Sequence, residues 1–259
     1  MKRLYFCFFL VCLYTSLAFS QDTLKLRIMT YNLRFGEKAS LEQLAEHIKA
    51  FDPDFVALQE VDVKTYRERA PLQNGKNFIS ELGYRTGMLS LYGKSIEYKD
   101  GYYGIGILSK HPYISVDKTM LAQPQKDKEQ RVMLQAKFEV NGKDTIVFAS
   151  THLDYFSAET RNIQIEEIQR ILEQSLYPVI LGGDFNARPD SKEIRMGMSN
   201  WQLLTDNDNT VPAHAPKYKI DYLYGYPKDI WNISWSQAIH SQLSDHLPII
   251  TEVNLLINK

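Results

Sequence analysis

The pattern of hydrophobic and polar positions predicts alternating strands and helices in the first part of the chain. Residues 24–30 alternate like a strand with one buried face, and residues 54–61 form an almost continuous apolar run, typical of a strand covered on both faces. The segment 41–54 between them has the period of an amphipathic helix. Ser40 is placed to cap this helix, with Gln43 completing a capping box, and its apolar face is formed by Leu41, Leu44, Ala45 and Ile48.

The same order of elements recurs over residues 144–186. Residues 144–154 predict an apolar strand with a polar end, residues 158–176 a helix, and residues 177–186 a second buried strand. The apolar residues expected along one side of the helix are Ile163, Ile168, Ile171 and Leu172. In both segments carboxylates follow the last strand, and sites in α/β proteins form outside the carboxyl ends of strands.

Further strands are predicted at residues 104–109 and 131–140 and, later in the chain, from Ile220 and from Leu247. Many strands with few helices predict an α/β fold in which two β-sheets pack together and helices flank them. No Gly/Ser linker, low-complexity tract or block of charge divides the sequence after residue 20. We therefore expect a single domain over residues 21–259.

Residues 1–20 have the parts of a signal peptide. Lys2 and Arg3 precede an apolar run over residues 4–17, and small residues at positions 18 and 20 suit a cleavage site. Because this run is short for a membrane span, we expect export to the periplasm or the extracellular space, with no membrane span after processing. Cys7 and Cys12 both lie in this segment, so the processed chain would carry neither a disulfide nor a zinc–cysteine site.

The charge balance disfavours one class of partner. The full chain carries 30 Lys and Arg against 31 Asp and Glu. Residues 1–20 contain two cations and no acid, so their removal leaves 28 cations and moves the formal charge from -1 to -3. Since cationic side chains supply most of the nonspecific affinity for a nucleic acid backbone, a dedicated duplex binder is not favoured. Nucleic acid is an alternative substrate that the charge balance disfavours but does not exclude.

Polar side chains collect where the predicted strands end. Taken singly, each has an ordinary structural explanation as a turn residue, a cap before a helix, or an imidazole bonded to the backbone. Taken together, they are the groups that handle phosphate oxygens around a hard divalent cation, because Mg²⁺ and Mn²⁺ prefer oxygen ligands. The set comprises Asn32, Glu60, His152, Asp184, Asn186, Asp221, Asp245 and His246.

Residues 182–190, GGDFNARPD, have two interpretations. Gly, Asp, Asn and Pro are common turn formers, so the segment could be an ordinary turn after a strand. In a site, the two glycines would let the backbone turn closely beneath a phosphate. Asp184 and Asn186, two residues apart in strand-like geometry, would then point to the same side.

Several motifs, in this order and at these intervals, resemble the signature of the endonuclease/exonuclease/phosphatase superfamily, the DNase I-like fold. They cover nearly all of the chain after residue 20: MTYNLR (29–34), LQEV (58–61), GILSK (106–110), STHLD (150–154), GGDFNARPDS (182–191), IDYLY (220–224) and SDHLPI (244–249). The GGDFNARPDS motif resembles in particular the exported bacterial metal-dependent hydrolases and the deadenylase-like branch of the superfamily.

The resemblance implies a four-layer αββα sandwich, in which two mixed β-sheets are flanked by helices and the active site lies at one mouth of the paired sheets. By position in the motifs, Glu60 would bind the catalytic Mg²⁺, for which Mn²⁺ could substitute. Asn32 and Asp245 would help to hold or orient the ion.

The resemblance also implies roles for the remaining residues. Asp184 would orient and deprotonate the attacking water, and Asn186 would position that water or a phosphate oxygen. His246, oriented by Asp221, would stabilise the charged phosphorane, and His152 would bind phosphate or assist the leaving group.

One position departs from the family pattern. Many relatives carry an Asn where this chain has Ile105, so one substrate contact is missing or is supplied by a neighbour such as Tyr103. Arg188, beside the GGDFN segment, is a candidate for a phosphate contact. Arg131 and Arg161 are weaker candidates, because an arginine that begins a strand or helix commonly forms a surface ion pair.

The expected function is that of a secreted, monomeric, Mg²⁺-dependent phosphoesterase that acts on a small phosphodiester or phosphomonoester. One alternative is a nuclease acting on DNA or RNA. An alternative of a different class is a catalytically silent module that binds phosphate or carbohydrate in the same cleft. The complete set of acid, base and metal residues favours the enzyme, because a binding module does not need it.

Overall fold

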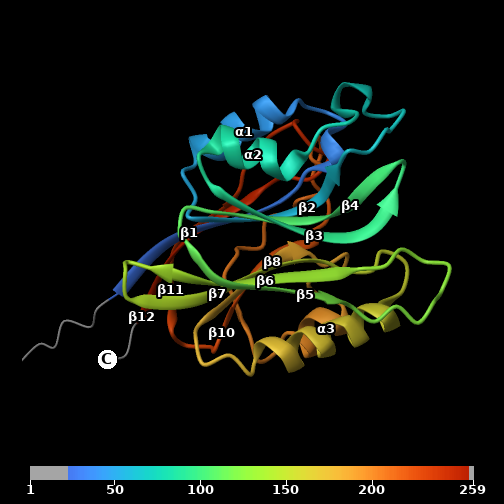
Figure 1. The fold of residues 1–259 in the computed structure, drawn as a ribbon. Coiled ribbons are helices and arrows are strands. Elements are labelled where there is room, and N and C mark those ends of the chain that lie inside the picture. The colour runs from blue at the N-terminus through green and yellow to red at the C-terminus, as the bar shows by residue number, and fades with distance from the viewer. Residues whose placement is uncertain (1–22, 257–259) are drawn as a thin grey trace, which may run out of the picture.

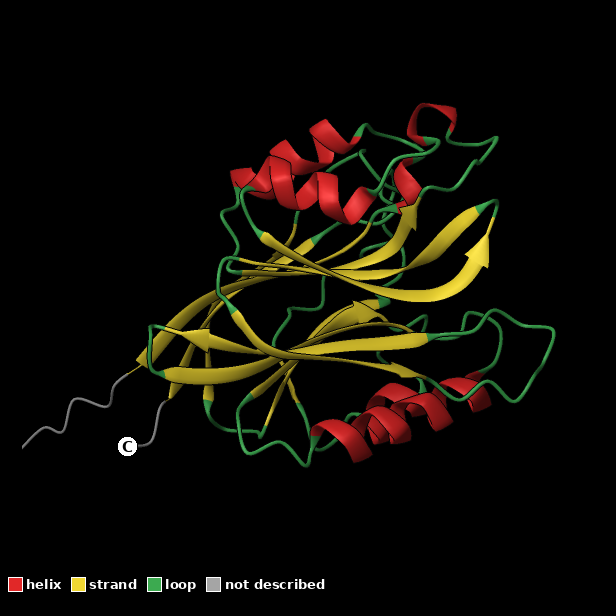
Figure 2. Cartoon of the chain, viewed as in Figure 1, coloured by secondary structure: helices red, strands yellow, loops and turns green. Residues whose placement is uncertain are grey.

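The computed structural model describes residues 23–256, which form two six-stranded β-sheets packed face to face (Figures 1 and 2). The first sheet, in spatial order, contains β11 (Trp231–Ala238), β12 (Ile249–Leu256), β1 (Thr23–Asn32), β2 (Phe55–Val63), β4 (Gly101–Ser109) and β3 (Leu89–Tyr98). The second contains β5 (Tyr113–Met120), β6 (Val132–Val140), β7 (Asp144–His152), β8 (Val179–Asp184), β10 (Asp221–Tyr226) and β9 (Gln202–Leu203).

Helices cover the outer face of each sheet. Helices α1 (Leu41–Ala50) and α2 (Phe78–Thr86) lie on the first sheet, and α3 (Ala158–Leu172) lies on the second (Figure 1). Short helical turns occupy Arg34–Gly36, Pro71–Gln73 and Glu193–Gly197. The expected four-layer αββα sandwich is therefore confirmed.

Each sheet contains one parallel pair of strands joined through a helix, β1 with β2 and β7 with β8, and its other neighbours are antiparallel. Parallel strands end at the same edge of a sheet. The register places Asn32 opposite Gln59 in the first sheet and His152 opposite Asp184 in the second. The polar strand ends predicted from the sequence thus come together in pairs.

Helix α1 begins as its sequence predicts, but it ends at Ala50 rather than at residue 54, because Asp52 has a φ of 48° and Pro53 follows it. The Ser40 hydroxyl accepts a hydrogen bond from the Gln43 backbone N–H at 3.2 Å, and the Gln43 side chain accepts one from the Ser40 N–H at 3.0 Å, which completes the capping box. The four residues predicted for its apolar face are all buried against the first sheet. A local signal and the tertiary packing therefore agree here.

Helix α3 differs from its prediction in length and in orientation. It ends at Leu172 rather than at residue 176, because the chain must turn before β8 begins, and Ser175 bonds to the backbone of Tyr177 in that turn. Ile163 is 36% exposed, whereas Ile165, which was not among the predicted residues, is 1% exposed and packs under the helix. The buried side is thus rotated from the predicted one.

Between the sheets lies an apolar core rich in phenylalanine. The ring of Phe55 in the first sheet stacks on Phe148 of the second, with ring centroids 5.0 Å apart, and meets Phe138 edge to face at 5.0 Å. Aromatic pairs in these arrangements contribute about 0.5–1.5 kcal/mol beyond the burial of their area. This core fixes the two sheets, and hence their strand ends, relative to one another.

Two predictions concern the N-terminus and the membrane. The predicted signal peptide, residues 1–20, lies outside the described residues. Within residues 23–256, no helix has the length and apolar character needed to cross a membrane.

Candidate active site

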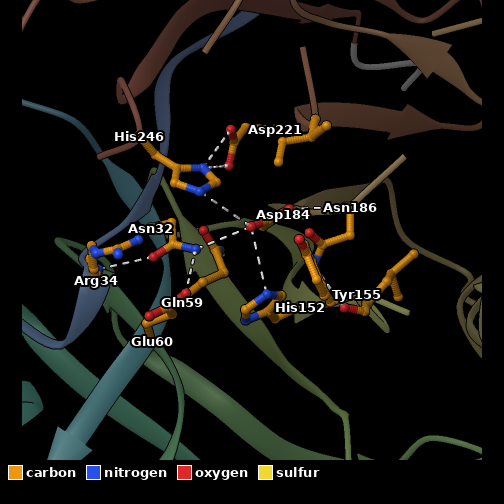
Figure 3. A network of polar contacts seen from close by, with 12 residues as sticks. Asn32, Arg34, Gln59, Glu60, His152, Tyr155, Asp184, Asn186, Asp221 and His246 are labelled. Carbon is orange, nitrogen blue, oxygen red and sulfur yellow. Dashed lines mark hydrogen bonds and ion pairs between the residues drawn. The ribbon is translucent and has the colours of Figure 1, made fainter. Parts of the chain in front are cut away.

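The predicted site residues meet at one end of the sandwich, where a cavity of about 710 Å³ opens between the strand ends. The first sheet contributes Asn32 and Glu60, and the second contributes His152, Asp184 and Asp221 (Figure 3). The predicted residues that line the cavity are Glu60, Tyr103, His152, Asp184, Asn186, Arg188, Asp245 and His246. Asn32 and Asp221 are buried and hydrogen-bonded to these residues.

The Asn32 amide joins carboxylates from the two sheets. Its Nδ2 donates to Glu60 Oε1 at 3.2 Å and to Asp184 Oδ2 at 3.1 Å, and its Oδ1 accepts from the Arg34 backbone N–H at 3.0 Å. The Ser244 hydroxyl donates to the backbone carbonyl of Asn32 at 2.7 Å. The Asn32 side-chain amide therefore bridges Glu60 and Asp184.

Glu60 lies at a bulge in β2. The pairing of β2 with β4 shifts register between Leu58 and Val61, and Glu60 has a backbone φ of 56°. A bulge changes the direction in which a side chain points, and here it leaves Gln59 buried between the sheets while the Glu60 carboxyl lines the cavity. Burial raises the pKa of Glu60, and His246 and the Asn32 amide oppose this shift.

His246 is held by Asp221. Asp221 Oδ2 lies 2.9 Å from His246 Nδ1 and also accepts a hydrogen bond from the Thr210 hydroxyl. Burial alone would lower the pKa of His246, but the Asp221 carboxylate outweighs it and raises the pKa to about 10. His246 is therefore an imidazolium at neutral pH, with Nε2 3.8 Å from Asp184 Oδ2.

Asp184 lies between two histidines of different charge (Figure 3). Burial, followed by the nearby Asp221 charge, raises the pKa of Asp184 to about 7. His152 Nε2 is 3.6 Å from Asp184 Oδ2, and burial together with the charges of Arg131 and His246 holds the pKa of His152 well below its ordinary value. Asp184 is thus poised to accept a proton near neutral pH, beside one neutral and one cationic imidazole.

Two groups in the cavity offer metal ligands. Asp184, Asp221 and His246 each have a ligand atom, and these atoms lie within 4.8 Å of one another. However, the His246 imidazolium repels a cation, and both Asp221 oxygens already contact His246. This group is better explained as a proton-transfer and anion-binding arrangement than as a metal site.

Glu60, Asn32 and Asp245 fit a hard cation better. Within residues 23–256, no lysine or arginine forms an ion pair with Glu60, and Asp245 adds negative charge beside it. Two carboxylates and an amide supply oxygen ligands of the kind Mg²⁺ prefers. Asp245 also pairs with Arg34, a contact that the sequence did not predict, so a cation would share Asp245 with the guanidinium.

The expected role of the two glycines is wrong. Gly182 and Gly183 lie within β8, where a Cβ on Gly183 would sit 2.3 Å from the Thr151 carbonyl oxygen and one on Gly182 would sit 2.9 Å from Ala57 Cβ in the facing sheet. They allow close approach of a neighbouring strand and of the other sheet, not a turn beneath a phosphate.

The turn after β8 is made by Asn186, so the expected strand-like geometry of Asp184 and Asn186 is also wrong. Asn186 has a φ of 49° and donates from Nδ2 to the Leu153 carbonyl at 3.0 Å, while its backbone N–H donates to Asp184 Oδ1 at 2.9 Å. Glu60 and Arg34 also have positive φ values, of 56° and 44°. Such backbone strain concentrates at functional sites.

Three of the four candidate substrate ligands, Tyr103, Arg188 and Arg161, have different surroundings. Tyr103 and Arg188 line the cavity, and the Arg188 guanidinium lies 4.0 Å from the centre of the Tyr218 ring. Arg161 is not part of the lining. It pairs with Glu193 at 2.8 Å and donates to the carbonyl oxygen of Tyr155 at 3.4 Å, so its contacts are those of a structural residue.

Sequence reasoning missed several residues of the cavity. Arg34 stood inside the MTYNLR motif and Tyr155 directly after STHLD, so their place beside a motif was an available signal. The other cavity residues without an assigned role are Glu129, Arg131, Phe156, Val211, Pro212, Tyr218 and Ile220. Of these, Arg131 was named only as a weak candidate, and its Nη1 pairs with Glu129 at 2.7 Å.

Comparison with known proteins supports the resemblance. The model of the Endonuclease/Exonuclease/phosphatase family matches residues 29–246. "Protein angel" of Drosophila melanogaster is 27% identical over 165 residues, which are 59% of this chain but only 44% of that relative. The chain thus matches less than half the length of this relative.

Solved structures share the fold. The crystal structure of an endonuclease/exonuclease/phosphatase from Beutenbergia cavernae matches with a TM-score of 0.74 at 17% identity, over 89% of this chain and 72% of that one. A mannosyl-6-phosphatase from Bacteroides thetaiotaomicron matches with a TM-score of 0.69 at 14% identity, over 88% of this chain and 99% of that one. Because the family model spans most of the sequence, the chain belongs to the endonuclease/exonuclease/phosphatase family.

Proposed function

We propose that the protein is a Mg²⁺-dependent phosphoesterase that hydrolyses a small phosphomonoester or phosphodiester, using a water activated by Asp184, and that it acts after export from the cell. The observation that carries the proposal is the buried Asp184 carboxyl. It has a pKa of about 7, and it lies beside the cationic His246. A base needs a pKa near the working pH to be both ionised and basic.

Each side chain of the site has its own role in the proposed reaction. Asp184 takes the proton of the attacking water, and the Asn32 amide and the Asn186 N–H keep its carboxylate oriented. His246 donates from Nε2 to a phosphate oxygen, where negative charge develops in the transition state. Asp221 keeps that imidazole charged and fixed through Nδ1. Neutral His152 donates to a second oxygen or to the leaving group.

Glu60, Asn32 and Asp245 would hold the metal ion. Mg²⁺ at this position would neutralise charge on the phosphate oxygens and help to orient the ester. The negative formal charge of the chain supports a small ester over a long nucleic acid, because a polyphosphate backbone requires an extended basic surface. The mannosyl-6-phosphatase that shares the fold is consistent with such a substrate.

The test is an activity panel with purified residues 21–259 in Mg²⁺, Mn²⁺ or EDTA. Substrates are p-nitrophenyl phosphate, bis(p-nitrophenyl) phosphate, sugar and inositol phosphates, sphingomyelin, DNA and RNA. We expect hydrolysis of a small ester that EDTA abolishes. A preference for nucleic acid would contradict the substrate class, and bound Mg²⁺ without hydrolysis of any substrate would indicate a binding module.

Asp184→Asn tests the assignment of the base. Turnover should fall by about 10²–10⁴-fold, the usual contribution of a general base, while the fold is retained. The matched control is Asp190→Asn, the same change at an exposed position of the following loop outside the cavity lining. Near-normal turnover by a folded Asp184→Asn variant would refute the mechanism.

A further inference from the structure

An aromatic pair at the cavity has no part in the proposed chemistry. Tyr155 and Phe156 line the cavity, yet their side chains are exposed by 66% and 65%. Their rings meet edge to face with centroids 5.3 Å apart. Large apolar side chains gathered in a ligand cavity commonly mark a contact with the ligand, because they gain free energy when they are covered.

The loop that carries these rings is firmly held. Asp154 Oδ1 accepts hydrogen bonds from the backbone N–H groups of Phe156 and Ser157 at 2.8 and 2.7 Å. Its Oδ2 accepts from Gln123 Nε2 at 3.1 Å. Arg161, anchored by Glu193, donates to the Asp154 carbonyl at 3.1 Å. The backbone is therefore fixed in advance, which lowers the entropy lost when a ligand covers the rings.

Other groups in the cavity suit a flat, anionic ligand. The Arg188 guanidinium, stacked at 4.0 Å on Tyr218, presents a second planar surface. Outside the lining, the Lys128 ammonium lies 4.6 Å from the centre of the Phe156 ring and pairs with Asp127 at 3.4 Å. His152, which contacts Asp184, is three residues before Tyr155, so the rings lie close in sequence to the reacting centre. The cavity of about 710 Å³ has room for an organic group beside the phosphate.

Building on the proposed function, we propose that Tyr155 and Phe156 form a stacking subsite for a flat-faced ring in the phosphate ester, and thereby determine which esters the enzyme prefers. The ring is that of a nucleobase or of a pyranose sugar, since both present a flat face that stacks on an aromatic side chain. The ester phosphate then lies at Asp184 and His246 while its ring covers the aromatic pair.

The experiment compares esters that differ only in the group beyond the phosphate. Adenosine 5′-monophosphate, glucose 6-phosphate and glycerol 3-phosphate are all esters of primary alcohols, so the bond that breaks is the same. Their methyl diesters extend the series to the other ester type. Values of kcat and KM are measured for the wild type and for the double variant Tyr155→Ala/Phe156→Ala.

We expect the wild type to prefer at least one ring-bearing ester over the glycerol ester. In the double variant, the ratio of kcat/KM for the ring-bearing ester to kcat/KM for the glycerol ester should fall about 10- to 100-fold, which is the contribution of one stacked ring. Most of this fall should come from a higher KM for the ring-bearing ester. Tyr155→Phe should retain the preference because it keeps the ring. The control is Tyr84→Ala, which removes an 88% exposed tyrosine from α2 outside the cavity lining and should leave the preference unchanged.

The outcomes separate this inference from the proposed function. The adenosine and glucose esters distinguish a nucleobase from a sugar. An equal fall in kcat/KM for ring-bearing and ringless esters would overturn the stacking subsite, because the loop would then serve the reaction or the fold. A wild type that cleaves no ester in either series or in the activity panel would instead refute the proposed function, and the subsite with it.

Discussion

Asp184 and His246 occupy the same buried region, but the charges around them decide what burial does to each. Burial favours the neutral form of both groups. For Asp184, the Asp221 charge adds to this effect and the pKa rises to about 7. For His246, the carboxylate of Asp221 opposes it and the pKa rises to about 10. Between these two values Asp184 is a carboxylate and His246 an imidazolium, which is the state that the proposed reaction needs.

The first residue-level prediction concerns the pH dependence of kcat/KM. Activity should rise with pH as Asp184 ionises near pH 7 and fall as His246 loses its proton near pH 10. In Asp221→Asn, both limbs should move to lower pH, because the lost charge had raised both pKa values. The profile is measured with a small ester at saturating Mg²⁺. An alkaline limb that does not move in Asp221→Asn would contradict the assigned pairing.

The second residue-level prediction concerns the thermal stability of the Asp184→Asn variant. The pKa of Asp184 is about 7 in the folded state against 3.8 as its ordinary value, so folding becomes less favourable as pH rises from about 4 to 7 and is then unaffected by this group. Asp184→Asn should therefore raise Tm at pH 8 in EDTA and have little effect at pH 4. Each kcal/mol corresponds to about 2–4 °C in a domain of this size. A lower Tm at pH 8 would show that the carboxylate stabilises the fold.

At the scale of elements, local sequence signals predicted structure where packing agreed with them. Helix α1 has a capping box and a clear apolar face, and both are present. In α3 the predicted face was rotated, because Thr160 and Gln164 are buried in place of Ile163. Polar side chains with buried hydrogen-bond partners, such as Gln164 to the Ala122 carbonyl, cannot be recognised from hydrophobic periodicity.

Apart from the short helical turns, five elements were not predicted: α2, β3, β5, β9 and β11. Strand β5 shows the physical reason, since most of its residues are exposed and its sequence lacks the alternation of a half-buried strand. It is a strand because its backbone pairs with β6 at the edge of the second sheet. An edge strand formed by backbone pairing has a weak side-chain signature.

The element-level prediction concerns β8. Gly183→Ala would place a methyl group 2.3 Å from the Thr151 carbonyl oxygen, so β7 and β8 must separate. We expect a loss of about 1–3 kcal/mol, the usual range for overpacking, together with reduced turnover because His152 and Asp184 end these two strands. Chemical unfolding measures the change. Asp117→Ala on the exposed strand β5 is the control, and an equally small effect of both variants would contradict the packing role.

At the scale of the molecule, the site exists only because the two sheets are docked. The family motifs located most of its residues, but not the contacts between them. Arg34 and Asp245, which are 211 positions apart in the sequence, form an ion pair. The exposed side chains of Tyr155 and Phe156 line the cavity because the loop after β7 passes beside it. Contacts of this kind depend on tertiary packing, which periodicity and short motifs do not encode.

The prediction for the whole molecule concerns Mg²⁺ and stability. A ligand that binds only the folded state stabilises it by an amount that grows with the ratio of the free ligand concentration to Kd. Mg²⁺ should therefore raise the Tm of the wild type increasingly with concentration, and the effect should be largely lost in Glu60→Gln. Thermal unfolding measures it without reference to activity. Glu68→Gln, at an exposed position outside the cavity, is the matched control. An undiminished shift in Glu60→Gln would place the ion elsewhere.

The hydrogen bonds of Asn32 to Glu60 and to Asp184 tie the proposed activity to complete folding. In the proposed mechanism, the first sheet carries the ion-binding Glu60 and the second carries the proton acceptor Asp184, so a chain whose sheets are not docked would hold only half of the reactive groups. A newly made or damaged molecule would therefore leave the phosphate compounds around it intact until both sheets are in place.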